Sequence, residues 1–429
     1  MTPLLRFELT AVLLGLVLLF TVVPHAITGD GLVRYDSLNK LLTTGTVPEQ
    51  RYSYVGPLFA APLWLAGTRT ERLWLAERFN VMLLAAGALL QWQLLRKSLT
   101  LQVRSAFVLM LVAAGMMPNH VRDFYGEVFT AVAVASGLLI VLLEEHGAGW
   151  MLVVAGVVNT PASLGGLVLV GGWRWWRSRR YDAAAAVLVA AALVLLENLV
   201  VRGGVLATSY SGDRGLHTVL PFSGRSGFSY PLIAGLLSLL FSFGKGILFF
   251  SPGLLFVAPA RRALDRRTAE VLDAWVLFLA GLLLVYARWW AWYGGWFWGP
   301  RFLLIAVFPS TLALAVMLSV PARPARRLAV GAVVLWTFWV GVSGAVFGND
   351  GLGVCMENGY ALEHLCWYVP EFSPLIRPLV IPPASLAGWQ VTWMLFAAIA
   401  GAALATSSVA VVPRDAPGPD GPDAAPAGR

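Results

Sequence analysis

An acidic residue, Asp30, closely follows the first long apolar run of the chain, residues 9–23. A carboxylate at a membrane boundary is costly unless it is solvated, paired or used in function. Arg34, Tyr35 and Asp36 follow it within six positions. A carboxylate can take a proton from an attacking hydroxyl group, and a guanidinium group can hold a phosphate. The segment therefore has the residue types needed for general-base chemistry on a phosphorylated substrate.

The alternative to a catalytic role for Asp30 is a structural role. The apolar residues after it recur at helical spacing, at Leu32, Tyr35, Leu38 and Leu42. This spacing predicts a short amphipathic helix lying on a membrane surface. Asp30 stands at the start of that helix, where a side-chain carboxylate can accept from the free N–H groups of the first turn. Capping and catalysis both stay open at this point.

The composition is that of a membrane protein. Of the 429 residues, 58% are hydrophobic and 13% are charged, with 18 Trp; the mean hydropathy is +0.72. Soluble domains are about 25% charged. We expect an all-α, polytopic transmembrane protein with about 12 spans and external amphipathic helices. The first apolar run lacks an Ala-x-Ala cleavage site and is expected to stay in the protein as a span.

Basic residues predict the orientation. They cluster at residues 96–104, 174–180, 261–267 and 323–327, which are alternate connections between apolar runs. Short basic connections face the cytoplasm, so the long loops are expected outside. The net charge of +8 is then mostly a matter of topology, and no nucleic-acid partner is expected. Residues 1–412 are expected to form the transmembrane domain, and residues 413–429 a disordered cytoplasmic tail.

Two apolar runs are interrupted at positions where a broken helix could line a binding cavity. Residues 150–173 are broken by Asn-Thr-Pro at 159–161, and a later run is broken by Gly-Lys-Gly at 244–246. Broken helices are tolerated within a membrane where they line a cavity. The first break predicts two half-spans that meet near the outer side.

The expected outer loops contain further candidates. The segment MPNHVRDFYGE supplies Arg122, Tyr125 and Glu127, and two later segments supply Lys245 and Arg301. Such cations suit the phosphate of a membrane-embedded substrate. The segment ARWWAWYGGWFWGPRF also predicts a wall of aromatic rings for a sugar-lipid, with an ordinary interfacial aromatic belt as the alternative. The wall residues would be Trp292, Tyr293, Trp296 and Trp298.

These motifs, taken in order, resemble the C superfamily of membrane glycosyltransferases (GT-C). The succession DGLVRY, TG and GPL is similar to the first external loop of protein O-mannosyltransferases and lipid A aminoarabinose transferases. The segments RDFYGE, NTP, FSFGKGILFFSPGLL and WYGGWFWGPRFLL resemble a bacterial branch of these enzymes. The chain departs from the pattern at Gly31, where relatives carry a second acid, and at Gly56, where they carry a proline.

The resemblance implies a multi-pass enzyme of the cytoplasmic (inner) membrane with an extracytoplasmic active site. It would move a sugar from a polyprenyl-phosphate donor to a glycolipid, a cell-wall polysaccharide or a protein. Asp30 would be the base, and Glu127 would orient the acceptor or a basic partner. No cofactor is expected. A divalent cation stays open as an alternative, although Gly31 in place of a second acid argues against a metal role. The substrate-binding candidates are Arg34, Tyr35, Asp36, Arg122, Tyr125, Lys245, Trp292, Tyr293, Trp296, Trp298 and Arg301.

Two other functions stay open. A polysaccharide polymerase or ligase would use similar chemistry, and a secondary transporter also has about 12 spans with broken helices. The sequence shows no inverted repeat, few acids inside the expected spans and long loops on one side only. These features favour the enzyme over the transporter.

Two cysteines, Cys355 and Cys366, share the expected external loop of residues 349–383. The outer side of the membrane is oxidising. A disulfide between them is therefore predicted, with two free thiols as the alternative.

Cysteine labelling tests the orientation. A cysteine placed at Ser211 should react with an impermeant reagent from outside, and one at Ser178 only after the membrane is permeabilised, because the arginine clusters predict opposite sides for the two positions. The reverse pattern would put Asp30 in the cytoplasm and contradict a polyprenyl-phosphate donor.

Overall fold

The computed structural model describes residues 3–68, 70–207, 210 and 213–407. Within these residues the chain forms helices and loops, and its only β-type pairing is one antiparallel bridge between Arg214 and Ser226. The expected tail, residues 413–429, and the labelling position Ser211 lie outside the described residues. The predicted all-α class is confirmed for the described part of the chain.

Seven helical segments are long and apolar enough to cross a membrane, judged by length and composition. Five shorter apolar helices lie among them. The chain is therefore a multi-pass membrane protein, and the number of about 12 spans stays a prediction. The long segments are α4 (Glu71–Leu94) with η1 (Leu95–Lys97), α7 (Gly126–Leu143), α10 (Asp182–Arg202), α14 (Arg266–Tyr286), η4 (Arg301–Ala306) with α15 (Val307–Ser319), α16 (Pro324–Val342) with the π-helical turn η5 (Ser343–Phe347), and α20 (Gly388–Ser407). The shorter ones are α1 (Pro3–Thr21), α3 (Val55–Ala66), α5 (Leu101–Ala113), α8 (Ala148–Asn159) and α11 (Leu232–Phe241).

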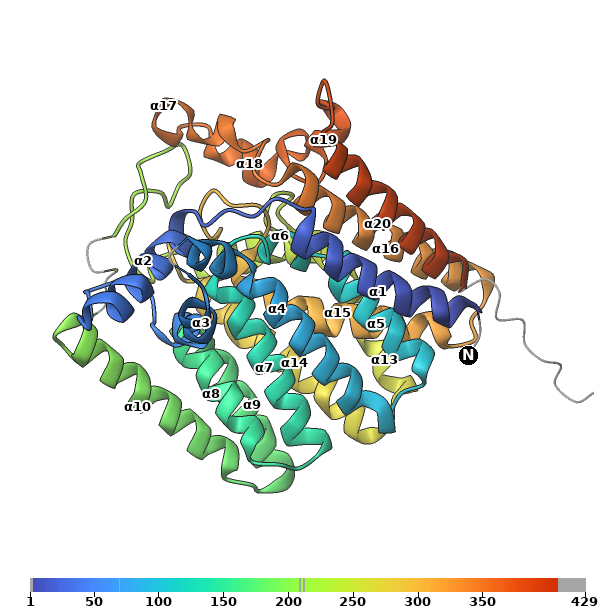
Figure 1. Ribbon diagram of the computed structural model, residues 1–429, viewed down its shortest axis with the longest axis horizontal. Coiled ribbons are helices and arrows are strands. Elements are labelled where there is room, and N and C mark those ends of the chain that lie inside the picture. Colours follow the sequence, from blue (N-terminus) through green and yellow to red (C-terminus); the bar gives the residue numbers. More distant parts are fainter. Residues whose placement is uncertain (1–2, 69, 208–209, 211–212, 408–429) are drawn as a thin grey trace, which may run out of the picture.

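Short helices connect these elements and complete the ends of the bundle. Figure 1 shows α17, α18 and α19 at one edge of the molecule, away from α8, α9 and α10. The remaining elements are α2 (Gly29–Thr44), α6 (Met117–His120), η2 (Pro161–Ser163), α9 (Leu164–Ser178), α12 (Ile247–Phe250), η3 (Pro252–Phe256), α13 (Val257–Ala263), η6 (Gly353–Met356), α17 (Glu357–Tyr360), α18 (Glu363–Tyr368), η7 (Pro370–Phe372) and α19 (Arg377–Val380).

Small residues bring the long helices close together. Gly137 of α7 faces Gly149 of α8 so closely that a Cβ on either would overlap the other's backbone oxygen. Gly281 of α14 packs in the same way against the backbone of Gly165 and Gly166 in α9. Since lipid tails are as apolar as leucine, close packing of this kind is a main source of helix association in a membrane.

Helix α2 forms as predicted, but Asp30 does not cap it. The N-cap residue is Thr28. Asp123, which follows α6, anchors this end by accepting from the backbone N–H of Thr28 at 3.1 Å and from its hydroxyl at 2.6 Å. Asp30 lies in the first turn, and its carboxylate contacts Arg301 instead. The capping alternative is therefore wrong.

The apolar face of α2 packs on protein, which corrects the prediction of a helix resting on the membrane surface. Leu38 is fully buried, and Tyr35 and Leu42 pack beside it against an apolar cluster that includes Phe79 and Phe129. Only the first residue of the predicted stripe, Leu32, is largely exposed, at 44%. Helix α2 is thus fastened to the bundle, which holds its first turn in place.

Both predicted helix breaks are present. Helix α8 ends at Asn159 and α9 starts at Leu164, with η2 between them. Pro161 stands at the break, where its missing N–H cannot continue a helix. The second break separates α11 from α12 and exposes the backbone around Lys245 to neighbouring segments.

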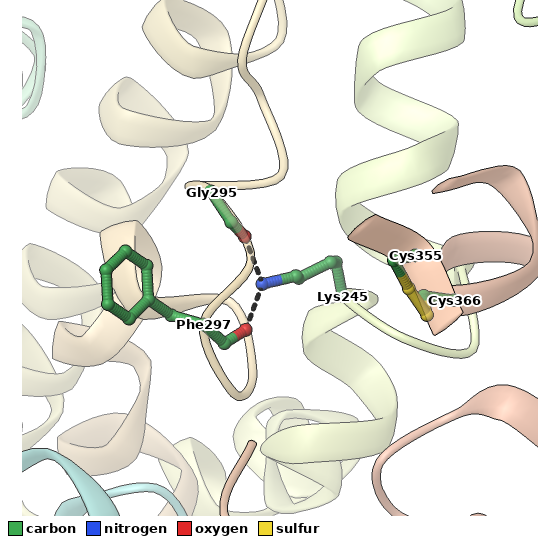
Figure 2. The surroundings of a disulfide bond; sticks show 5 residues. All are labelled: Lys245, Gly295, Phe297, Cys355 and Cys366. Carbon is green, nitrogen blue, oxygen red and sulfur yellow. Dashed lines mark hydrogen bonds between the residues drawn. A yellow bond between two sulfur atoms is a disulfide. The ribbon is translucent and has the colours of Figure 1, made fainter. Parts of the chain in front are cut away.

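Cys355 and Cys366 form a disulfide that joins η6 to α18, with Cα atoms 6.1 Å apart. Both residues are fully buried. Figure 2 shows this disulfide beside the turn that carries Lys245. The backbone N–H of Gly244 donates to the carbonyl of Trp367 at 3.1 Å, and a Cβ at Gly244 would overlap the carbonyl oxygen of Cys366. The loop of residues 353–368 is therefore packed directly on the 244–246 turn.

Replacing both cysteines by serine should lower the free energy of unfolding by about 2 to 3 kcal/mol, because the disulfide closes a short loop. Thermal unfolding in detergent would measure this loss. A reductant should destabilise the wild type and leave the double variant unchanged. Free thiols in unreduced peptides by mass spectrometry would contradict the pairing.

Candidate functional site

Two acids from distant segments converge on the guanidinium group of Arg301. Its Nη1 atom lies 2.7 Å from Oδ2 of Asp30 and 3.5 Å from Oε1 of Glu127. Asp30 comes from the first turn of α2, Glu127 from the first turn of α7, and Arg301 from the start of η4. The side chains of the three are only 7% to 21% exposed. The structure thus brings together three residues that the sequence had singled out separately.

The loop before η4 holds Arg301 in this position. Its Nε donates to the carbonyl of Gly294 at 2.7 Å, and its Cζ lies 4.3 Å from the ring centre of Phe297. Gly294 has a φ of +74°, a conformation that glycine adopts readily. The Gly-Gly pair of the predicted aromatic segment thus shapes the loop that carries the cation.

Lys245 supports the same loop and does not face a substrate. Its ammonium donates to the carbonyls of Gly295 and Gly299, each at 3.0 Å, and also to that of Phe297. Figure 2 shows two of these bonds. An ammonium group has three donors, and the side chain is fully buried. No donor is left for a phosphate, which corrects the prediction that Lys245 binds substrate.

Asp30 is held in its ionised form. Burial acts to raise its pKa, but the charge of Arg301, the Tyr52 hydroxyl that donates to it, and the charge of Arg34 outweigh burial. The pKa of Asp30 therefore lies below its ordinary value. The ionised carboxylate of Asp30 can accept a proton once the guanidinium of Arg301 moves toward another negative group.

Arg34 supplies a second buried cation, as predicted. Its Nη1 donates to Oδ1 of Asn159 at 3.3 Å and to the carbonyl of Ser53 at 3.4 Å, and its Cζ lies 4.7 Å above the ring of Tyr52. Its Nε finds no acceptor among the residues described. A Cβ at Gly126 would collide with the guanidinium group, so the glycine before Glu127 makes room for it.

Asn159 organises the polar residues around Arg34. Its Oδ1 also accepts from the backbone N–H of Gly56 at 3.0 Å, and its Nδ2 donates to the carbonyl of Gly126 at 2.8 Å and to Thr130 at 3.0 Å. The sequence marked Asn159 only as a helix break and gave it no place in the site. A polar amide inside an apolar run was the signal that could have found it.

Asp123 occupies the space where relatives' second acid would stand. A Cβ at Gly31 would overlap Oδ1 of Asp123. The same oxygen accepts from the backbone N–H of Phe124 at 2.6 Å. A larger residue at position 31 therefore has no room, and the carboxylate near it comes from another segment.

Two predicted residues of α2 lie away from this site. Tyr35 packs in the apolar cluster beneath the helix, and Asp36 is exposed on its other face. Successive side chains of an α-helix are rotated by about 100° about the helix axis. Neither Tyr35 nor Asp36 can therefore face Arg301 together with Asp30. Their assignment to substrate binding stays a prediction, and it would need a part of the substrate that lies away from Arg301.

The predicted aromatic wall is mostly internal packing. Trp292, Tyr293 and Trp298 are buried. Tyr293 stacks on Trp367 at 4.9 Å, and Trp296 stacks on Tyr360 at 3.9 Å. These rings join the 287–302 segment to α17 and α18 instead of forming a free wall.

A polar cavity of about 290 Å³ lies beside the three-residue cluster. Tyr125 and Phe297, whose rings lie near the guanidinium of Arg301, form part of its lining. Arg122 also lines it, with Nε donating to the carbonyl of Pro24 at 2.9 Å. Other lining residues are Thr28, Asn119, His120, Asp123, Trp298, Asp350, Trp389 and Gln390.

The carboxylates of the cluster do not form a ready metal site. The described residues contain no group of three or more His, Cys, Asp or Glu placed to hold a metal ion. Between Asp30 and Glu127 stands the guanidinium of Arg301, in the place that a shared cation would need.

Comparison with known proteins identifies the fold. No family model matches the chain, and no curated protein matches it by sequence. The crystal structure of ArnT from Cupriavidus metallidurans bound to undecaprenyl phosphate superimposes with a TM-score of 0.54, at 15% identity over 94% of this chain and 78% of that one. The apo structure of the same ArnT gives the same TM-score over 77% of its length.

The chain has a GT-C-like fold. The structural likeness covers nearly the whole chain although few residues are identical. An archaeal oligosaccharyltransferase, AglB from Archaeoglobus fulgidus in complex with an inhibitory peptide and a dolichol-phosphate, superimposes more loosely, with a TM-score of 0.44, 12% identity and coverage of 79% of this chain and 55% of that one.

Replacing Lys245 by methionine should loosen the loop that carries Arg301. The change keeps the length of the side chain but leaves three buried carbonyls without their donor, at a cost of about 1 to 3 kcal/mol for each group left unsatisfied. Hydrogen exchange should become faster in residues 294–300, and thermal stability should fall. Lys40→Met, at an exposed position of α2, is the matched control and should change neither. Unaltered exchange in the Lys245 variant would show that the ammonium does not hold the loop.

Proposed function

We propose that this protein transfers a sugar from a polyprenyl-phosphate donor to an acceptor on the outer side of the membrane. The observation that carries the proposal is the buried contact of Asp30 and Glu127 with Arg301. The likeness to ArnT, which was crystallised with undecaprenyl phosphate, supports a lipid-phosphate ligand for this fold. The cluster contains both a base and a cation, which are the two groups that such a transfer needs.

The chemistry follows from the charges of the cluster. The acceptor hydroxyl oxygen forms a bond to the anomeric carbon, and the bond from that carbon to the phosphate oxygen breaks. The electron pair leaves with the lipid phosphate, and the hydroxyl proton passes to Asp30. A guanidinium group binds phosphate oxygens in a forked geometry, so Arg301 would stabilise the leaving group.

The pairing of Asp30 with Arg301 couples these two roles. In the structure without substrate, Arg301 helps keep the pKa of Asp30 low. When Arg301 turns its charge toward a donor phosphate, Asp30 loses part of that stabilisation and becomes more basic. Glu127, the second acid beside the guanidinium, would keep the cation in place while Asp30 takes up the proton. Arg34, with Nε free of any acceptor in the described residues, offers a second donor to the phosphate.

The acceptor would approach through the cavity beside Tyr125. Its lining combines the amide side chains of Asn119 and Gln390, the carboxylate of Asp350 and the ring of Trp389. Planar polar groups can exchange hydrogen bonds with hydroxyl groups, and an aromatic face can pack on a sugar ring. These groups suit an acceptor rich in hydroxyl groups, such as a glycolipid or a cell-wall polysaccharide.

Asp30→Asn should reduce the transfer rate by at least about 10²-fold, because an amide cannot take the acceptor proton. Binding of the lipid-phosphate donor should survive, since Arg301 and Arg34 are unchanged. Purified protein incubated with radiolabelled polyprenyl-phosphate sugars and membrane lipids would measure transfer, and a binding assay with the same donors would measure affinity.

Asp36→Asn is the matched control, because Asp36 is an exposed acid on the same helix. It should leave the rate unchanged. In the wild type, protonation of Asp30 should not limit the rate near neutral pH, because the charge of Arg301 and the other partners of Asp30 outweigh burial and hold its pKa below the ordinary value. Transfer at the wild-type rate by a well-folded Asp30→Asn variant would remove Asp30 as the base.

A further inference from the structure

A second cavity, of about 330 Å³, lies at the end of the bundle opposite to Asp30. Helix α7 carries Glu127 in its first turn and Leu142, which lines this cavity, near its last residue. Fifteen residues of α-helix separate the two by roughly 22 Å. Helix α14 likewise runs from Arg266 at the cavity to Tyr286, whose ring stacks on Phe302 beside Arg301 at 4.2 Å. The second cavity therefore belongs to a separate place in the fold.

Arginines dominate the lining of this cavity. It contains two acids, Glu145 and Glu270, and five arginines, which are Arg174, Arg177, Arg180, Arg266 and Arg267. Each acid is shared: Glu270 lies 3.0 Å from Arg177 and 3.1 Å from Arg266, and Glu145 lies 2.9 Å from Arg267 and 3.9 Å from Arg180. A guanidinium group has five N–H donors. Shared in this way, the acids leave donors and positive charge for an added anion.

The wall of the cavity is ordered by a buried arginine. Arg174 is 8% exposed and donates through Nε and Nη2 to the two carboxylate oxygens of Asp182, at 3.0 and 2.9 Å. The other four arginines of the lining are more exposed, from 37% in Arg177 to 80% in Arg266. A buried, doubly bonded arginine beside four more exposed ones differs from the loose basic surface that membrane orientation alone requires.

Apolar side chains form another part of the cavity lining. Val141, Leu142 and Trp173 line it. Close by on the same helix, Trp175 is 40% and Trp176 is 75% exposed, and the guanidinium of Arg179 lies 5.0 and 6.0 Å from their ring centres. Exposed tryptophans of this kind sit at the level of lipid head groups.

We propose that this cavity binds the phosphate group of an anionic phospholipid from the adjacent leaflet. Guanidinium groups hold phosphate in charge-assisted, forked hydrogen bonds, and basic pockets between membrane helices suit lipid head groups. Val141, Leu142 and Trp173, the apolar part of the lining, take the glycerol and the first methylenes of the chains. A free phosphate would make no use of them. The proposal is independent of the transfer reaction at the other end of the bundle.

Native mass spectrometry of the full chain tests this binding. The protein is placed in phosphatidylcholine nanodiscs that contain one-fifth phosphatidylglycerol and is then released. The wild type should retain phosphatidylglycerol preferentially. The double variant Arg177→Gln/Arg267→Gln should retain at most about one-tenth as much phosphatidylglycerol, because charge-assisted hydrogen bonds to the phosphate are lost. Glu270 and Glu145 keep Arg266 and Arg180 as partners in that variant.

Matched variants make the result decisive. Arg323→Gln/Arg326→Gln removes two exposed arginines from another basic connection and should retain as much phosphatidylglycerol as the wild type. Equal losses in both double variants would overturn the proposal in favour of general charge attraction. If thermal unfolding shows that the first variant is not folded, Arg177→Lys/Arg267→Lys replaces it. This variant keeps the charge but removes the forked hydrogen bonds of the guanidinium groups, so its retention of phosphatidylglycerol should still fall. Unchanged retention there would also overturn the proposal.

A second arm separates a lipid from a free anion. Inorganic phosphate is added before release at about 10 mM, a concentration that would fill a site with a dissociation constant of about 1 mM. Retained phosphatidylglycerol should stay at the level seen without phosphate. Complete displacement by inorganic phosphate would assign the cavity to a soluble anion and overturn the lipid proposal.

Discussion

The buried guanidinium of Arg301 is the constraint on which the end of the bundle that holds Asp30 depends. Taking a charge out of water costs several kcal/mol unless partners replace the lost hydration. Asp30 and Glu127 supply opposite charge, the carbonyl of Gly294 supplies an acceptor, and the ring of Phe297 covers one face. Because these partners come from α2, α7 and the loop before η4, the need to compensate one charge joins segments that are far apart in sequence.

A second buried cation supports the first. Lys245 fastens three carbonyls of the loop that ends at Arg301. The turn that carries Lys245 is itself packed under α18, where Gly244 bonds to the backbone of Trp367 next to the disulfide of Cys366. The loop of residues 353–368, the broken helix and the charged cluster are thus one continuous arrangement. Rigid support of this kind is what keeps a polar site in its working geometry.

The two ends of the bundle use arginine differently. At the end that holds Asp30, one guanidinium is nearly enclosed and its neighbours are acids with defined contacts. At the opposite end five arginines share a few acids around an open cavity. Close packing of glycines between α7 and α8, and between α9 and α14, holds these ends in fixed relation. A likeness to ArnT at 15% identity shows that this helix arrangement survives when most residues differ.

Composition and the pattern of apolar runs were enough to determine the all-α membrane class, the two helix breaks, and Asp30, Glu127 and Arg301 as residues of interest, because a charge at the edge of an apolar run is costly wherever the chain goes. The sequence could not say that these three meet. It misplaced Lys245 and the tryptophans of residues 292–298, because composition does not show whether an ammonium or a ring points into a cavity or into packing. Nor did it show that Asn159 would anchor Arg34 or that Asp123 would fill the space at Gly31. Those contacts depend on how helices distant in sequence cross, and only the tertiary structure decides that.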